Sequence, residues 1–329
     1  MCLTGGSVFR RGESLRTVYL KVTRRCNLRC AHCFIQDYRG DMPLAIVERV
    51  AELFPTSVIV FHGGEPTMMG LPYILDCIKI LGARPYVLQS NMINFSSQWL
   101  PLLMEHFDGA IGTSLDDARF PHLQRWLNNV AIAANAGIKV TAVVTVTPRL
   151  TVRALSQALQ QFQEAGGRAF RLQFVTPVKT QAISPESYRE FFTAFYDHPL
   201  NEARHRIDSA LCLGFHNGIN GGNCGGSLRT IEPDGTVYVC PDLAGQSLFP
   251  LGNVMRPGEG NVKNDTLFFR RQTILSLKCD DDCWRLCRGG CLASAYFHHG
   301  EPMEKDPYCS IYKGLITFTR GEERISCAG

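Results

Sequence analysis

Long apolar runs and a strong charge of either sign are both missing from this sequence. No window of 18 consecutive residues is apolar, so no segment is predicted to cross a membrane. The formal net charge of +4 over 329 residues is small and does not favour binding to nucleic acid or to a membrane. The first 16 residues have neither an apolar run nor a small-residue cleavage site, so no secretory signal is expected. We therefore expect a cytoplasmic protein.

Cysteine, in contrast, is abundant, with 14 residues that are unevenly distributed along the chain. In a reducing compartment, clustered cysteines usually bind metal instead of forming disulfides. Three of them lie in the stretch RRCNLRCAHCF, residues 24–34, and eight lie between residues 212 and 309. The remaining three stand alone: Cys2, Cys77 and Cys327.

The first half of the chain alternates between strand-like and helical patterns. Its apolar runs are nearly continuous, which is typical of parallel strands covered by helices. Six consecutive β-α units predict an α/β fold with a partial (β/α)6 barrel, in which chemistry takes place at the carboxyl ends of the strands. Strands are expected at residues 17–23, 57–62, 85–90, 109–115, 139–146 and 169–175, and helices at 44–54, 71–81, 97–107, 121–137 and 152–167.

After about residue 180 the pattern changes. Helices are predicted at 184–197 and 201–213, followed by a β-hairpin at 227–240 that turns at Pro233-Asp234-Gly235. From there to Cys309 little is periodic, so metal ligation is expected to supply the order. The expected organisation is a core domain, a helical linker and a small cysteine-rich domain, at residues 1–180, 181–211 and 212–329.

The three-cysteine loop, Cys26, Cys30 and Cys33, directly follows the first predicted strand. Three thiolates can hold three corners of a four-iron cluster, which leaves one iron open to an external molecule. The alternative is a zinc site completed by His32 or by a distant residue, because three cysteines and one histidine are a common zinc ligand set.

Polar residues also follow the other predicted strands. In HGGEP, residues 62–66, the two glycines allow a close backbone approach to a ligand, and Glu65 offers a carboxylate to an amino group. QSN (89–91) and SLDD (114–117) end two further strands. Each stretch alone is explained by an ordinary turn, but their convergence on one barrel rim favours a binding site.

The spacing Cys-x3-Cys-x2-Cys after the first strand, with GGEP after the second, resembles the radical S-adenosylmethionine (radical SAM) superfamily over about residues 17–175. The resemblance implies that Cys26, Cys30 and Cys33 ligate a [4Fe-4S] cluster whose open iron binds SAM. The reduced cluster would cleave SAM to methionine and a 5′-deoxyadenosyl radical, with electrons from a reductant such as flavodoxin or ferredoxin. It further implies contacts between SAM and the following residues: Gly63, Gly64, Glu65 and Pro66 for the amino group, and Asn91 and Ser114 for the ribose or carboxylate.

The eight downstream cysteines are similar to the SPASM extension of radical SAM enzymes, which holds two auxiliary [4Fe-4S] clusters. Their central run, CDDDCWRLCRGGC, has gaps of three, three and three where the family has two, five and three. Two zinc sites of four cysteines are the alternative. The clusters would either accept electrons or stabilise the structure of this loop-rich, cysteine-rich module. By the family pattern, one cluster would be held by Cys212, Cys224, Cys240 and Cys291, and the other by Cys279, Cys283, Cys287 and Cys309.

Two aspartates are candidate catalytic bases. In anaerobic sulfatase-maturing enzymes, which carry this extension, an aspartate directly after the equivalent cysteine acts as base. Here Pro241 occupies that place and Asp242 comes one residue later, where capping of a turn is the alternative. Asp116, with its neighbour Asp117, ends a predicted strand and is the second candidate.

The resemblance therefore implies an enzyme that abstracts a hydrogen atom from its substrate. We expect oxidative modification of a ribosomally synthesised peptide, by a cross-link or a related C–H functionalisation. Oxidation or epimerisation of a small polar metabolite such as an aminoglycoside, and anaerobic sulfatase maturation, are the alternative activities. A radical-inactive iron–sulfur or zinc scaffold is the alternative outside the enzymes.

Overall fold

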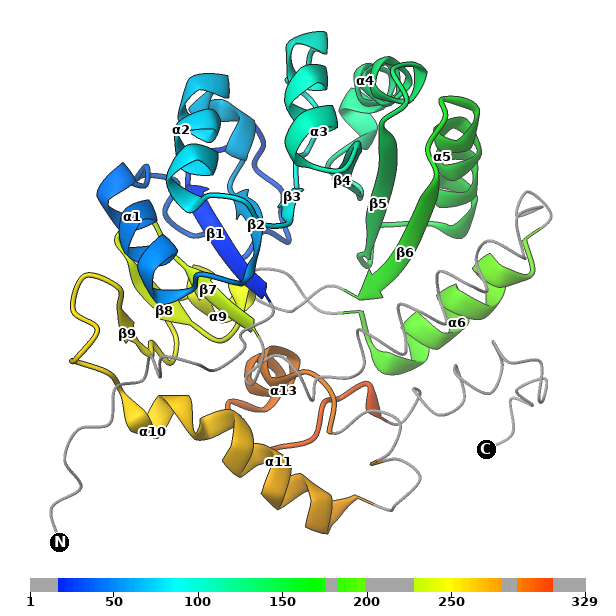
Figure 1. The fold of residues 1–329 in the computed structure, drawn as a ribbon. Helices are drawn as coiled ribbons and strands as arrows, with labels where there is room; N and C mark the ends of the chain where they lie inside the picture. Colours follow the sequence, from blue (N-terminus) through cyan, green and yellow to red (C-terminus); the bar gives the residue numbers. More distant parts are fainter. Residues whose placement is uncertain (1–16, 175–182, 199–227, 280–283, 285–288, 310–329) are drawn as a thin grey trace, which may run out of the picture. The chain divides into compact units, whose positions relative to one another are not determined.

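A computed structural model of the chain describes residues 17–174, 183–198, 228–279, 284 and 289–309 (Figure 1). Within this described part, no helix has both the length and the apolar character needed to span a membrane. The chain divides into two compact units. Unit 1 contains Met1–Thr113, Ala136–Ile138 and Asn223–Arg270, and unit 2 contains Ser114–Asn135, Lys139–Gly222 and Arg271–Gly329.

Unit 1 is built on a six-stranded sheet with the strand order β3-β2-β1-β7-β8-β9. Its first strands pair in parallel, as predicted from their continuous apolar runs. Val18, Leu20 and Val22 of β1 are fully buried, as are Ile59 and Phe61 of β2. The strands are β1 (Thr17–Thr23), β2 (Val58–Gly63), β3 (Tyr86–Leu88), β7 (Leu228–Ile231), β8 (Thr236–Tyr238) and β9 (Gly252–Asn253).

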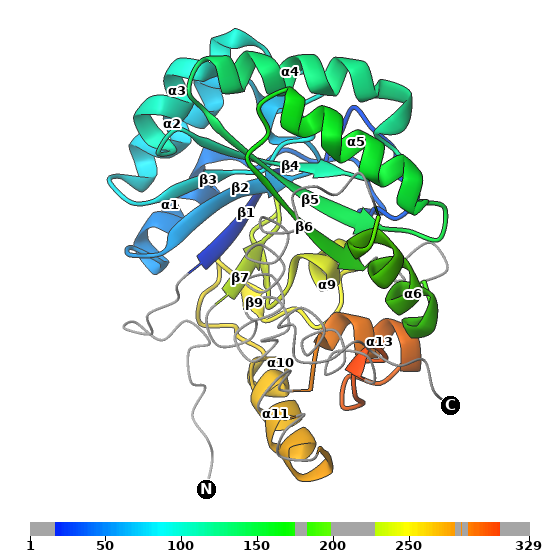
Figure 2. The same cartoon turned by 90° about the vertical axis from the view of Figure 1, so that its right-hand side faces the viewer.

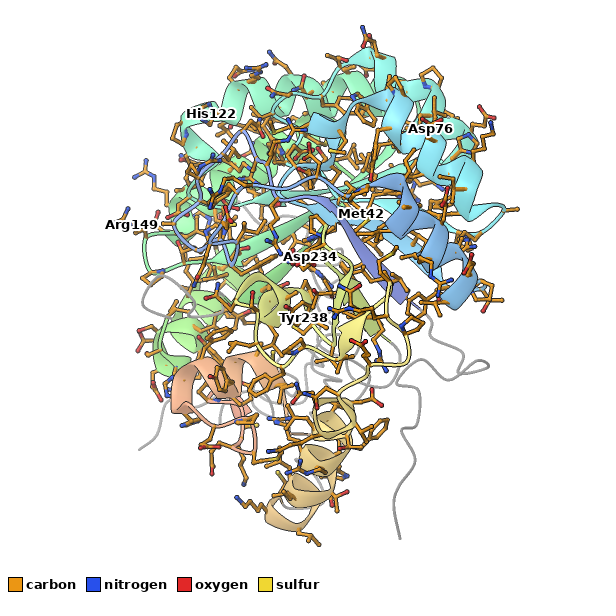
Figure 3. The ribbon with its side chains drawn as sticks, turned by 90° about the vertical axis from the view of Figure 1, so that its left-hand side faces the viewer. Met42, Asp76, His122, Arg149, Asp234 and Tyr238 are labelled. Atoms are coloured by element: carbon orange, nitrogen blue, oxygen red, sulfur yellow. The ribbon has the colours of Figure 1, made fainter. Side chains whose placement is uncertain are left out.

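The helices of unit 1 follow the expected amphipathic pattern. In α2, Ile74, Cys77, Ile78 and Leu81 are buried at helical spacing, while Asp76 lies on the exposed side (Figure 3). The lone Cys77 is a core residue, 0% exposed, and burial raises the pKa of its thiol to about 12. The helical segments are α1 (Leu44–Leu53), η1 (Pro66–Met69), α2 (Leu71–Leu81), η2 (Ser97–Trp99), α3 (Leu100–His106), α9 (Pro241–Gly245) and α10 (Val262–Asp265).

The predicted β-hairpin is present, and it has a partner that the sequence did not indicate. β7 and β8 pair antiparallel around a turn in which the backbone N–H of Gly235, at φ +82°, donates to the carbonyl of Glu232. β7 also pairs in parallel with β1, from Thr17 opposite Leu228 onward. The hairpin therefore continues the sheet of unit 1. The proposed domain limits at residues 180 and 211 stay a prediction.

Unit 2 alternates strands and helices in the same way. The boundary between the units falls inside β4, after Thr113, and the sheet order is β4-β5-β6. α4 and α5 lie side by side over β5 and β6 (Figure 2), and Trp126 of α4 stacks on Phe162 of α5 with ring centroids 5.2 Å apart. The elements are β4 (Ala110–Leu115), η3 (Phe120–His122), α4 (Leu123–Asn135), β5 (Lys139–Val146), α5 (Val152–Glu164), β6 (Ala169–Phe174), α6 (Pro185–Tyr196) and α13 (Leu292–His299).

One helix of 12 residues, α11 (Leu267–Lys278), lies in the part of the chain where the sequence predicted little periodic structure. Its positions 267, 271 and 275 are buried at helical spacing, but position 271 is an arginine that is 0% exposed. A charged residue at the centre of the buried face interrupts the apolar pattern, which explains why the sequence did not predict the helix. The helix predicted at 201–213 lies outside the described residues.

Candidate functional site

The three-cysteine loop leaves directly from the carboxyl end of β1. Cys26, Cys30 and Cys33 are half-buried, and none of them forms a disulfide. The backbone N–H of Cys33 donates to the carbonyl of Cys30 at 3.1 Å, which closes a turn, and that of Leu28 donates to Sγ of Cys26 at 3.4 Å. The loop therefore presents three partly accessible thiols on a hydrogen-bonded segment.

The two glycines of the GGEP segment are required by packing against this loop. A Cβ atom on Gly63 would lie 2.2 Å from the carbonyl oxygen of Thr23, and one on Gly64 would lie 2.2 Å from that of Arg25. The backbone N–H of Gly64 donates to Thr23 O, and that of Glu65 donates to Arg25 O, both at 2.8 Å. The close approach permitted by the glycines is thus to the chain that leads into the cysteines.

The carboxylate of Glu65 is fully buried and accepts four hydrogen bonds. Its Oε1 accepts from the backbone N–H and hydroxyl of Thr67, at 3.1 and 2.6 Å, and from the hydroxyl of Ser90 at 2.8 Å. Its Oε2 accepts from the backbone N–H of Asn91 at 2.6 Å. Glu65 therefore braces the carboxyl end of β2 against the segment after β3, and its predicted contact with an amino group stays a prediction.

Asn91 joins the segment after β3 to the cysteine loop. Its side-chain amide donates to Oδ1 of Asn27 at 2.7 Å and lies 3.8 Å from Sγ of Cys26. Its own Oδ1 accepts from the backbone N–H of Ile93 at 2.9 Å, and the residue is 6% exposed. N–H groups directed at cysteine sulfur are the hydrogen bonds that stabilise thiolate ligands of iron–sulfur clusters. The chemistry around Cys26 therefore fits a thiolate ligand.

Tyr38 is a contact of the loop that the sequence did not indicate. Burial, and secondly a hydrogen bond with Cys33, raise the pKa of its phenol well above the usual range. The guanidinium of Arg29 lies 4.0 Å from the centroid of the Tyr38 ring, and Nη1 of Arg29 donates to the carbonyl of Cys26 at 2.6 Å. The loop is therefore covered on this side by a neutral phenol and a cation.

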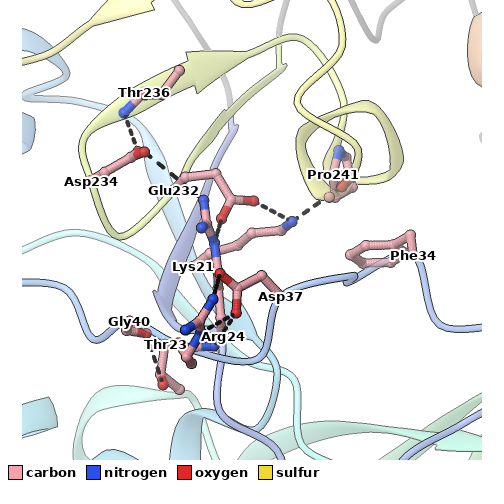
Figure 4. A network of polar contacts seen from close by, with 12 residues as sticks. Lys21, Thr23, Arg24, Phe34, Asp37, Gly40, Glu232, Asp234, Thr236 and Pro241 are labelled. Atoms are coloured by element: carbon pink, nitrogen blue, oxygen red, sulfur yellow. Dashed lines mark hydrogen bonds and ion pairs between the residues drawn. The ribbon is translucent and has the colours of Figure 1, made fainter.

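A buried ion pair lies beside the loop at the carboxyl ends of β1 and β7 (Figure 4). Nζ of Lys21 is 2.5 Å from Oε1 of Glu232, and both side chains are at most 2% exposed. Nε of Arg24 is 2.7 Å from the other carboxylate oxygen of Glu232. A lysine inside the apolar run TVYLKVT was the only sequence signal for this cluster, because a buried lysine requires a partner.

His62, opposite Lys21 in the pairing of β1 with β2, is held neutral. Burial, and secondly the charge of Lys21, lower the pKa of His62 to about 3. Its ring stacks on Phe34 with centroids 6.2 Å apart, and its buried Nδ1 has no hydrogen-bond partner among the described residues.

Ser114 and Asp116, predicted to contact SAM and to act as a base, lie at the end of β4 and are linked by Arg119. Nη2 of Arg119 donates to the hydroxyl of Ser114 at 3.2 Å, and its Nη1 lies 3.6 Å from Oδ1 of Asp116. That oxygen also accepts from the backbone N–H of Ala118 at 3.0 Å, and Asp116 is 1% exposed. The structure thus joins two predicted residues through an arginine that no sequence motif indicated.

Asp242, the other predicted base, is the second residue of α9 and is half-buried. Cys240 is the N-cap of this helix and Pro241 its first residue, a position that favours proline. An acidic residue in the first turn interacts favourably with the helix dipole. The geometry therefore gives Asp242 a structural role, and its catalytic role stays a prediction.

Four of the eight downstream cysteines lie in the described part of the chain. All four are half-buried and none forms a disulfide: Cys240, Cys279, Cys291 and Cys309. The other four lie outside the described residues: Cys212, Cys224, Cys283 and Cys287. The grouping of the eight cysteines into two clusters therefore stays a prediction.

Asp306, 1% exposed, contacts the backbone of two of these cysteines in unit 2, that of Cys291 through its carboxylate and that of Cys309 through its backbone carbonyl. Oδ2 accepts from the backbone N–H of Cys291 at 2.6 Å, and Oδ1 accepts from the hydroxyl of Ser294 at 3.2 Å and the backbone N–H of Tyr308 at 3.0 Å. The backbone N–H of Cys309 donates to the carbonyl of Asp306 at 3.0 Å. One buried acidic residue, which no sequence motif indicated, thus holds the backbone of two predicted ligands.

Arg271 orders the glycines that precede Cys291. Its guanidinium donates to four backbone carbonyls, those of Gly289 at 2.6 Å, Gly290 at 3.2 Å, Pro302 at 2.8 Å and Glu304 at 3.0 Å. Because segments without regular structure have few internal partners for their carbonyls, a buried donor with several N–H groups can organise them. Arg271 therefore fixes the backbone on both sides of α13.

Comparisons with known proteins agree with this geometry. Residues 20–162 match the family model of the Radical SAM superfamily. An AdoMet-dependent heme synthase of Nitratidesulfovibrio vulgaris is 24% identical over 351 residues, which cover 90% of this chain and 92% of the relative. A cysteine-type anaerobic sulfatase-maturating enzyme of Clostridium perfringens is 26% identical over 352 residues, covering 89% and 93%. The solved structure of native anSMEcpe with bound AdoMet and Cp18Cys peptide has a TM-score of 0.69 at 20% identity and covers 93% of this chain and 98% of that one, so the two share a fold.

Proposed function

Because residues 20–162 match the model of the Radical SAM superfamily, we propose that this chain is a member of that superfamily. We propose further that it holds a [4Fe-4S] cluster on Cys26, Cys30 and Cys33 and oxidatively modifies a ribosomally synthesised peptide. The structure of the three-cysteine loop is the main support for this cluster site. Three half-buried thiols lie at the carboxyl end of β1, on a segment hydrogen-bonded to the GGEP backbone. When bound, such a cluster supplies the electron that cleaves SAM to methionine and a 5′-deoxyadenosyl radical.

The chain's own residues hold and orient the reactants. Gly63 and Gly64 keep the GGEP backbone in contact with the cysteine loop, and the buried Glu65 prevents that backbone from shifting. We propose that the backbone of Gly63–Pro66 receives the amino group of SAM, with Asn91 and Ser114 as candidates for its ribose or carboxylate. A preformed site of this kind costs little reorganisation when the reactant binds.

We propose that the downstream cysteines hold two auxiliary [4Fe-4S] clusters of the SPASM type. The support is the number of cysteines and the buried residues Arg271 and Asp306, whose hydrogen bonds hold the backbone at Gly289, Cys291 and Cys309. Oxidation of a substrate radical releases one electron, and a cluster with only cysteine ligands can accept it. Asp242 and Asp116 are the candidate groups for the accompanying proton.

A peptide substrate is supported by the similarity to native anSMEcpe, whose solved structure has bound AdoMet and Cp18Cys peptide. Besides the clostridial sulfatase-maturating enzyme, a mycofactocin maturase of Mycobacterium tuberculosis is 25% identical over 329 residues and covers 88% of this chain. Sulfatase maturation is the second candidate, favoured by the clostridial similarity. Pro241 stands where those enzymes are expected to carry the aspartate base, which weakens that candidate. The similarity to a heme synthase keeps small-molecule oxidation as the third outcome of the test below.

The cofactor proposal is tested with anaerobically purified protein and Cys30→Ala. We expect about twelve irons per chain, from three clusters of four, and release of 5′-deoxyadenosine after dithionite reduction with SAM. Cys30→Ala should lose about four irons and reduce the deoxyadenosine to background. The matched control is Cys77→Ala, which removes a thiol that the structure buries in α2 and should keep iron and activity. Stoichiometric zinc in place of iron contradicts the proposal.

The substrate proposal is tested by co-expression with any short peptide encoded beside the gene. Loss of hydrogen atoms from that peptide, detected by mass spectrometry and dependent on Cys30, supports peptide modification. Modification of a cysteine peptide taken from a sulfatase favours maturation instead. Turnover of a small metabolite alone contradicts the peptide proposal and leaves the cofactor proposal intact.

A further inference from the structure

The ammonium group of Lys21 lies at the meeting point of two cysteine-bearing segments of unit 1 (Figure 4). It is 4.7 Å from the ring centroid of Phe34, the residue directly after Cys33. It also donates to the carbonyl of Pro241, the residue directly after Cys240, at 3.2 Å. One buried cation therefore contacts both the three-cysteine loop and the segment that begins at a proposed auxiliary ligand.

The two segments also pack directly on each other. A Cβ atom on Gly245, in the short helix after Cys240, would lie 2.6 Å from the Phe34 ring and 2.7 Å from the Phe34 carbonyl oxygen. The side-chain amide of Gln246 donates to that same carbonyl. No room is left between Phe34 and α9, so a displacement of one segment is transmitted to the other.

The charges around Lys21 are arranged as a compensated cluster. Glu232 accepts from Lys21 through one oxygen and from Arg24 through the other, at 2.5 and 2.7 Å. Arg24 lies two residues before Cys26 and is 26% exposed at its side chain. Nη2 of Arg24 also lies 4.0 Å from Oδ2 of the exposed Asp234, so the two cations face two anions and their charges balance. A buried ion pair stabilises little by itself because of its desolvation cost, so a role in positioning explains it better than a role in stability.

We infer that the Lys21–Glu232 ion pair is a positioning element that joins the segment after Cys33 to the segment after Cys240 and acts electrostatically on the iron–sulfur groups that those segments carry. The inference rests on the proposed function for the identity of these groups. A clustered thiolate site becomes more negative on reduction, so a nearby positive charge favours the reduced form and a nearby negative charge opposes it.

Two substitutions therefore have opposite expected effects. Lys21→Met removes a positive charge and should shift the midpoint potential of the neighbouring cluster to a more negative value. Glu232→Gln removes a negative charge and should shift it to a more positive value. Lys21→Arg keeps the charge and several N–H donors, so it should restore the native potential. A merely structural brace would give shifts of the same sign, or none, with both substitutions.

The test uses anaerobically purified full-length protein and two measurements. Hydrogen–deuterium exchange reports on the backbone of residues 241–246, whose amides should exchange at least several-fold faster in Lys21→Met and at the native rate in Lys21→Arg. Redox titration followed by electron paramagnetic resonance reports on the potentials, with Cys30→Ala and Cys240→Ala used to assign the signals. The matched control is Arg39→Ala, which removes an ion pair with Asp37 whose arginine side chain is 90% exposed.

Faster exchange in Lys21→Met with rescue by Lys21→Arg, together with potential shifts of opposite sign, supports the inference. Unchanged exchange in Lys21→Met, an effect equal to that of Arg39→Ala, or shifts of the same sign overturns it. If the native protein contains no iron and releases no deoxyadenosine, the proposed function fails. The exchange measurement then still decides whether Lys21 positions the two segments, and equal rates in Lys21→Met and native protein would overturn that role too.

Discussion

The two cysteine-bearing regions of the described chain are ordered by different means. In unit 1, the three-cysteine loop is fastened to a parallel sheet, through backbone hydrogen bonds from Gly64 and Glu65 to residues 23 and 25. In unit 2, Cys291 is the N-cap of α13, a helix of eight residues, and its backbone N–H donates to the carboxylate of Asp306, while Arg271 holds the carbonyls of the two glycines before it. The backbone N–H of Cys309 donates to the carbonyl of Asp306.

The difference predicts how strongly the order of each region depends on the cluster proposed for it. The carboxyl ends of parallel strands fix the chain direction where a loop begins, so the loop of unit 1 has a defined position before any ligand binds. A segment with little regular structure must satisfy its backbone groups with side chains or with metal-bound cysteines. We therefore expect the unit 2 region to depend on its proposed auxiliary cluster far more strongly than the unit 1 region depends on the cluster proposed for its loop.

Removal of iron is expected to have the largest effect and tests whether the two regions differ in their dependence on metal. Structural metal sites contribute on the order of 10 kcal/mol to the order of the segments that they hold. After chelation, the amides of α13 and of residues 302–309 should lose most of their protection from hydrogen exchange, while those of β1 and β2 should keep theirs. Equal loss in both regions would show that the sheet does not preorganise the three-cysteine loop.

Arg271→Met tests the side-chain scaffold of unit 2. The substitution leaves four backbone carbonyls without their donor. Unsatisfied buried carbonyls cost about 1–3 kcal/mol each, partly recovered by water, so we expect about 4 kcal/mol of destabilisation in total. Denaturant unfolding followed by circular dichroism measures it. Arg270→Met, at the exposed neighbouring position on the same helix, should change the free energy of unfolding by less than about 0.5 kcal/mol, and an equal effect of the two variants would refute the scaffold.

Glu65→Gln tests the corresponding brace of unit 1, with a smaller expected effect. Glutamine replaces one acceptor oxygen by a donor, which must face an N–H or O–H group from Thr67, Ser90 or Asn91. We expect a loss of about 2 kcal/mol, since the backbone bonds of the sheet remain. Glu52→Gln, on the exposed side of α1, is the control. A loss larger than that of Arg271→Met would reverse the ranking of the two regions.

The sequence predicted most of the regular elements in both units. The strands at 17–23 and 139–146 and the helix at 71–81 have the predicted bounds, and most others differ by one to three residues at their ends. Hydrophobic periodicity and the glycines that end helices are local features of the sequence, so they can be recognised without a structure. The pairing of β1 with β7 was not visible, because it joins residues more than 200 positions apart and no local pattern encodes such a partner.

In the candidate site, too, local motifs were predicted from the sequence, whereas contacts between residues far apart in the chain were not. The cysteines and the GGEP segment were found from spacing, whereas the residues that hold them were missed: Lys21, Tyr38, Arg119, Arg271 and Asp306. Each of these polar groups is buried or partly buried by contacts that the fold creates, so its type and position carry no repeating signal. Glu65 was identified from its motif, and the structure adds that its oxygens brace two strand ends.

The smallest expected effect concerns pH and the neutral His62 beside the unit 1 loop. Its pKa is lowered to about 3 in the folded protein, from 6.5 in the unfolded chain. Below pH 6.5 the unfolded state therefore binds a proton that the folded state does not. The contribution of His62 to stability is full above pH 6.5 and is lost progressively as the pH falls toward 3.

His62→Phe keeps a ring against Phe34 and removes this titration. The ideal slope is about 1.4 kcal/mol per pH unit, but His62 is only half-buried as a residue, so we expect about 1 kcal/mol between pH 6.5 and 5. The measurement compares the free energies of unfolding of the native protein and the variant at each pH. The native protein should lose stability relative to His62→Phe as the pH falls, because the imidazole must be kept uncharged next to Lys21. A constant difference between the two proteins would mean that His62 accepts a proton in the folded state and that the cation of Lys21 does not reach it.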